Sequence, residues 1–219
     1  MGKLADYIGK YWAGAEVMYA VIIAMTFTSV LWNAEFAPDF VKENIVQTAL
    51  ACCIAWGFAD GLFYIWERKY ILNQERQIVS MSKDAGSRQE AVDQVRSQLD
   101  DSILRNIEPE KRERLYHGLV NELADVDEVA GLDRGWAIRI LSGTIILAAI
   151  AGVLILAPIY FLEPLSTAIL VSNILGIMLL FAVGFNRAYG KPLSLRFVNG
   201  GAAAVVGLII ALITTFLGG

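Results

Sequence analysis

Five long apolar stretches divide this chain, and almost all of its basic residues fall on one side of the alternating pattern that the stretches create. A hydrocarbon core of roughly 30 Å needs about 20 mostly apolar residues in helical form. The five stretches cover residues 17–33, 45–66, 136–161, 165–185 and 197–217. With a cytoplasmic N-terminus, 17 of the 18 Lys and Arg residues lie inside and only Lys42 lies outside, as the positive-inside rule requires. We therefore predict an all-α integral membrane protein with five transmembrane helices.

The composition favours the same class. Apolar residue types make up 56% of the 219 residues and the mean hydropathy is +0.53, which is too apolar for an ordinary soluble domain. The expected partner is a lipid bilayer, and the expected location is a cell membrane, with the N-terminus cytoplasmic and the C-terminus outside. Nucleic acid is not expected as a partner, because residues 67–135 carry 15 acidic against 11 basic residues.

The sequence predicts three parts. The first two transmembrane helices lie within 1–66, a cytoplasmic helical insertion occupies 67–135, and the last three transmembrane helices lie within 136–219. In the insertion, Ser87 and Glu90 have the spacing of a capping box, and apolar residues then recur at intervals of three and four, so a helix is expected over about 87–106. Pro109 favours the start of a second helix. The insertion is therefore expected to be a small helical hairpin.

Asp60 interrupts the second apolar stretch. A carboxylate inside a transmembrane helix costs at least a few kcal/mol unless it meets a cavity, a partner or a proton, so it is a candidate functional residue. Asn173 in the fourth stretch and Thr26 and Thr28 in the first supply further oxygens, and together these groups would suit a hard or borderline divalent cation. The alternative is structural: Asp60 binds hydroxyl groups of a neighbouring helix, and the threonines bond to their own backbone.

Two further acidic residues lie at the predicted inner ends of the first two transmembrane helices. Glu16 precedes the first apolar stretch and Glu67 follows the second. They are candidates for a ring of charge through which cations approach. The alternative is that they form ordinary boundary ion pairs with Lys10 and Arg68.

The insertion contains a second candidate metal site. Glu110, Glu113 and His117 share one face of the predicted helix, since they are spaced at i, i+3 and i+7. That spacing can hold a metal ion with help from a second helix, for example from Asp93, Asp100 or Asp101. The alternative is a solvated surface of mixed charge, because Lys111 and Arg112 lie beside these residues.

The run from Ala55 to Leu62 reads AWGFADGL, and an extension of the second apolar stretch and a charged helical insertion follow it. This arrangement resembles the vacuolar iron transporter family, whose second transmembrane helix often carries Ala-Asp-Gly. Five transmembrane helices with the insertion between the second and third are also similar to that family, as are Gly184, Gly200 and Gly201 in the last pair of helices. A set of uncharacterised prokaryotic membrane proteins within this group looks closer still, since they share the Glu16-Val17 start, the Thr26-Phe27-Thr28 run and the Ser172-Asn173 pair.

The resemblance implies transport of ferrous iron, or of a related ion such as Mn²⁺, out of the cytosol by proton antiport in a homodimer. Asp60 matches the aspartate of the family's second helix. Glu110, Glu113 and Glu122 lie in the region where the family gathers metal on glutamates. The family's first helix usually carries an Asp-Gly, whereas residues 20–29 of this chain contain no acid.

The leading hypothesis is therefore a transporter of divalent metal ions of the iron or manganese type. Opposed to it are a non-transporting membrane scaffold or regulatory protein, whose cytoplasmic hairpin binds a partner, and a passive channel. Phosphate-binding loops, nucleophile elbows and Cys or His clusters are lacking from the sequence. No enzymatic activity and no tightly bound cofactor are predicted.

Overall fold

The computed structural model describes residues 4–31, 37–99, 103–127, 129 and 131–217, with the side chains of residues 4–12, 38 and 103 left out. The described residues are helical apart from short connections, and no strand occurs among them. Two compact units are present. The first comprises residues 1–64 and 134–219, and the second comprises residues 65–133.

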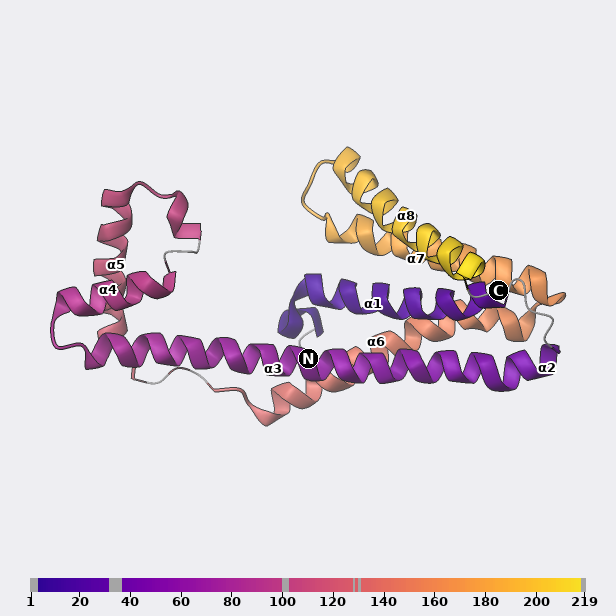
Figure 1. Cartoon of the computed structure of the whole chain (residues 1–219), viewed down its shortest axis with the longest axis horizontal. Coiled ribbons are helices and arrows are strands. Elements are labelled where there is room, and N and C mark those ends of the chain that lie inside the picture. The colour runs from indigo at the N-terminus through magenta and orange to yellow at the C-terminus, as the bar shows by residue number, and fades with distance from the viewer. Residues whose placement is uncertain (1–3, 32–36, 100–102, 128, 130, 218–219) are drawn as a thin grey trace. The chain divides into compact units, whose positions relative to one another are not determined.

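The first unit is a bundle of long helices (Figure 1). The prediction of five helices long and apolar enough to cross a membrane is confirmed. The elements of this unit are α1 (Leu4–Val30), the short α2 (Pro38–Phe40), a π-helical turn (Val41–Ile45), the first half of α3 (Val46–Asp84), α6 (Arg134–Phe161), α7 (Leu165–Arg187) and α8 (Leu193–Leu217).

Two helices extend more than ten residues beyond the apolar stretches that predicted them. The α1 helix begins at Leu4 rather than near Val17. Its first residues precede the apolar stretch and are mixed in character, so hydropathy alone does not mark the start of the helix. The α3 helix has 39 residues and runs on to Asp84. Between Gly61 and Gly86 the chain contains no glycine or proline to end it.

The α1 helix provides the centre of the bundle, packing against α6, α7 and α8. Its residues Ala20, Val21, Ala24 and Met25 are completely buried. The outward faces of α6, α7 and α8 are also apolar, and they expose large side chains such as Ile150. A bundle that is apolar inside and outside has the character of helices that meet lipid.

The second unit contains the remainder of α3, α4 (Arg88–Leu99), a short 3-10 helix (Ile103–Asn106) and α5 (Pro109–Ala124). The Ser87 Oγ accepts a hydrogen bond from the Glu90 backbone N–H (3.2 Å), and the Glu90 carboxylate accepts one from the Gly86 N–H (2.9 Å). The first of the two hydrogen bonds is that of the predicted capping box. The apolar core of the second unit contains the buried residues Ala91, Val92, Val95, Tyr116 and Val120.

Candidate functional site

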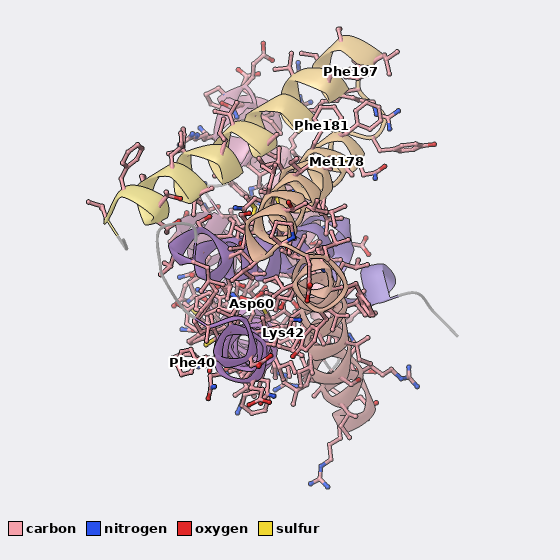
Figure 2. The ribbon with its side chains drawn as sticks, turned by 90° about the vertical axis from the view of Figure 1, so that its right-hand side faces the viewer. Phe40, Lys42, Asp60, Met178, Phe181 and Phe197 are labelled. Carbon is pink, nitrogen blue, oxygen red and sulfur yellow. The ribbon has the colours of Figure 1, made fainter. Side chains whose placement is uncertain are left out.

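A pair of carboxyl groups lies inside the first unit. Glu16 on α1 is completely buried (0% exposed), and apart from Asp60 its carboxylate oxygens have no hydrogen-bond partner among the described residues. The carboxyl group of Asp60 on α3 lies close enough to interact with it electrostatically. Asp60 is half-buried and lies among the packed helices in Figure 2, whereas Phe197 lies at the edge of the bundle. We call Glu16 and Asp60 the carboxylate pair.

Two glycines on α3 allow α6 to approach the carboxylate pair. A Cβ added to Gly57 would lie 2.8 Å from the Ala148 Cβ and 2.9 Å from the Thr144 carbonyl oxygen, and a Cβ added to Gly61 would lie 2.5 Å from the Thr144 Oγ1. Real Cβ atoms do not come this close to such neighbours. The glycines therefore fix the spacing of α3 and α6 beside the pair.

The same contacts place further oxygens near the pair. Glu16 Oε1 lies 3.1 Å, and the Thr144 carbonyl oxygen 2.9 Å, from the point where a Gly57 Cβ would lie. The Thr144 hydroxyl donates to its own helix, at the carbonyls of Ile140 (3.2 Å) or Leu141 (3.0 Å), which leaves its oxygen able to accept. The described groups beside the pair therefore offer oxygen atoms, which hard divalent cations prefer.

Charge decides what this site can do. Two neighbouring carboxylates repel each other, and burial has removed the hydration of Glu16, so the arrangement is stable only when a proton or a cation compensates the charge. Among the residues that the structure describes, no three His, Cys, Asp or Glu side chains form a group that could hold a metal ion. A cation at the carboxylate pair would therefore also need hydroxyl, carbonyl or water oxygens.

Glu16 lies near the first end of the first apolar helical segment, as predicted, but its side chain is buried and does not lie at an open boundary. Glu16 lies in the segment Ala13–Val30, which is apolar enough to cross a membrane, and its side chain points into the bundle. Residues Leu4–Ala15 extend the same helix before it. Glu16 is thus an interior residue and belongs beside Asp60.

The structure does not bring Thr28 and Asn173 to Asp60. Thr28 follows Glu16 by 12 residues, or about 18 Å along α1 at 1.5 Å per residue. The Thr28 hydroxyl donates to Asn173 Oδ1 on α7 (2.7 Å), with the Met25 carbonyl as an alternative acceptor (3.1 Å). Thr26 bonds to the Ile22 carbonyl of its own helix (2.9 Å). Thr28 and Asn173 therefore form a polar contact between α1 and α7 that is separate from the carboxylate pair.

This contact predicts different effects for two matched substitutions. Thr28→Val keeps the shape of the side chain but leaves Asn173 without its partner, so we expect a loss of about 1–2 kcal/mol in the free energy of unfolding. Thr26→Val removes a hydroxyl that bonds only to its own helix, and its expected effect is within about 0.5 kcal/mol. Unfolding of both variants in mixed detergent micelles measures the difference. Equal effects would show that the Thr28–Asn173 hydrogen bond does not stabilise the bundle.

The second unit does not assemble the predicted metal site among its described residues. Arg96 Nη2 donates to both carboxylate oxygens of Glu113, at 2.6 Å and 2.5 Å, and His117 Nε2 lies 3.6 Å from the same carboxylate. Glu110 and Glu122 are exposed. The reason is electrostatic, because the guanidinium group of Arg96 binds the Glu113 carboxylate that would have bound a cation.

Glu67 also lies in the second unit, where it is exposed to solvent. Its predicted partner Arg68 lies 3.9 Å from Glu75 instead. Asp100 and Asp101, which could have completed a metal site in the insertion, lie outside the described residues.

Comparison of the sequence with models of known protein families finds no match, and comparison with curated proteins finds no similar protein either.

Proposed function

We propose that this protein is a cation transporter of the membrane, in which the carboxylate pair binds a divalent metal ion of the iron or manganese type during its passage. The observation that supports this most is the complete burial of Glu16 against the carboxyl group of Asp60, with no other hydrogen-bond partner for its carboxylate oxygens among the described residues. The five long apolar helices support the bilayer as the surroundings of the bundle. The distribution of basic residues favours a cytoplasmic N-terminus.

The chemistry of the ligands supports a transient rather than a permanent ion site. Carboxylate, carbonyl and hydroxyl oxygens suit Mn²⁺ and other hard or borderline cations. Transport also requires that the ion leave, and a site with two carboxylates and few other fixed ligands binds less tightly than a closed protein cage. Because a proton can replace the metal ion at the pair, the same groups offer a basis for exchange of protons against metal.

Flux through purified protein tests the proposal. Vesicles that contain the reconstituted chain are expected to take up Mn²⁺ faster than protein-free vesicles, with the metal followed by a fluorescent indicator trapped inside. An internal pH indicator would report protons that move in the opposite direction. If no Mn²⁺ or Fe²⁺ enters in either orientation of a pH gradient, transport is disproved and the scaffold hypothesis takes its place.

A further inference from the structure

A groove at one end of the first unit combines positive charge with an apolar wall. It has a volume of about 470 Å³ and is lined from α1, α7 and α8 and the connection between the last two. Its polar lining comes from Arg187, Lys191 and Asn199, and its apolar lining includes Met18, Ala202 and Val206. Figure 1 shows α8 close to α1 near the C-terminus and further from it toward the start of α8.

The charge that α7, α8 and their connection bring to this groove is of one sign. Residues 165–219 contain three basic residues, Arg187, Lys191 and Arg196, and no acidic residue. Lys191 is exposed and forms no ion pair with the described residues. Arg196 is directed elsewhere, because its guanidinium lies 4.0 Å from the centre of the Phe185 ring and it does not line the groove.

Local contacts hold the shape of the groove. The aliphatic part of Arg187 lies across α1 at Gly14, with Cγ and Cδ both 3.1 Å from the point where a Gly14 Cβ would lie. Its Nη1 lies 3.5 Å from the Met18 sulfur. The close approach of Gly184 to Ala203 keeps α7 and α8 together below it. The groove is therefore a formed feature of the bundle, with its lysine at the rim.

We infer that this groove binds an anionic phospholipid, with the headgroup phosphate at Lys191 and Arg187 and an acyl chain along Met18, Ala202 and Val206. The chemistry of the lining requires a ligand with a negative head and an apolar tail, and a volume of about 470 Å³ is sufficient for a headgroup and the adjoining part of a chain. The connection 188–192 lies on the side that the basic residues assign to the cytoplasm, where anionic lipids bind basic sites between helices. The inference rests on the membrane location in the proposed function, but not on transport.

Lipid retention by the detergent-solubilised protein tests the inference. Native mass spectrometry after incubation with phosphatidylglycerol or phosphatidylcholine is expected to show one phosphatidylglycerol per chain retained in preference to phosphatidylcholine. Lys191→Gln should weaken this retention about fivefold, which is the effect of one lysine on an anionic lipid. Ala202→Leu should also weaken it, because Ala202 is an exposed residue of the apolar wall.

Arg196→Gln is the matched control, since it removes the same charge from the same hairpin outside the groove. Equal losses for Arg196→Gln and Lys191→Gln, or equal retention of the two lipids, would overturn the site. Stabilisation by glycerol phosphate as strong as that by phosphatidylglycerol would overturn the lipid as ligand. Failure of lipid binding in a protein that still sediments with membranes contradicts this inference alone, whereas a protein that needs no detergent contradicts the membrane location.

Discussion

Replacement of Asp60 by asparagine is expected to lower the rate of Mn²⁺ uptake by reconstituted vesicles by roughly 10- to 100-fold, the range for loss of a group that supports metal binding. Asparagine has the size of aspartate but lacks its charge, so the bundle should assemble while one half of the carboxylate pair is lost. The measurement is the initial rate of uptake at several Mn²⁺ concentrations. An unchanged rate would remove Asp60 from the transport pathway.

Asp39→Asn is the matched control for this substitution. Asp39 is an exposed residue of α2, so its replacement by asparagine makes the same chemical change outside the bundle. We expect its uptake rate to equal that of the unmodified protein. A loss of the same size in both variants would mean that total charge, and not the carboxylate pair, controls uptake.

Glu16→Gln separates a transport role from a structural one by its opposite effects on flux and stability. Flux should fall as for Asp60→Asn, because the second carboxylate is lost. The amide N–H of glutamine can donate to the Asp60 carboxylate, so folding at neutral pH no longer requires the uptake of a proton or a cation at the pair. We therefore expect a gain of about 1 kcal/mol, or about 2–4 °C in the unfolding temperature. A structural carboxylate would instead lose stability in this variant. Loss of flux together with loss of stability would therefore contradict the proposed role of Glu16.

The architecture followed from hydropathy because length and apolar character alone determine whether a helix can span a bilayer. The helices α6, α7 and α8 begin and end within four residues of the predicted stretches, since Pro164, Gly190 and Pro192 interrupt the chain between them. The start of α1 was not predictable in this way. Residues 4–15 are helical without being uniformly apolar, so hydropathy placed the boundary too late.

Of the two residues of the carboxylate pair, only Asp60 could be recognised from the sequence as a residue inside the membrane. Asp60 interrupts an apolar stretch and is visible as an exception, whereas Glu16 lies at the edge of one and looks like a boundary charge. A helical face did carry the missing signal: Glu16, Ala20 and Ala24 recur every four residues, and all three are completely buried. The separation of Asn173 from Asp60 needed the structure, because sequence does not show which helices are neighbours at a given depth.

Introducing a methyl group at Gly57 is expected to destabilise the bundle by about 1–3 kcal/mol, the usual cost of extra volume in a close-packed contact. In Gly57→Ala the new Cβ would lie 2.8 Å from the Ala148 Cβ and 2.9 Å from the Thr144 carbonyl oxygen. Neither atom belongs to a flexible side chain, so α3 and α6 must move apart. The free energy of unfolding in mixed detergent micelles measures the cost.

Gly201→Ala provides the control with the opposite expected sign. No atom lies within 4 Å of a Cβ built on Gly201, which is in the interior of α8. Alanine is favoured over glycine at such a position by about 0.5–1 kcal/mol, because it restricts the unfolded chain more. The Gly57→Ala substitution has a second expected effect. Because it separates α3 from α6, it should increase the distance between Thr144 and the carboxylate pair, and it should reduce Mn²⁺ uptake even where the protein remains folded. A Gly57→Ala protein as stable and as active as the Gly201→Ala protein would show that the close contact of α3 with α6 does not define the site.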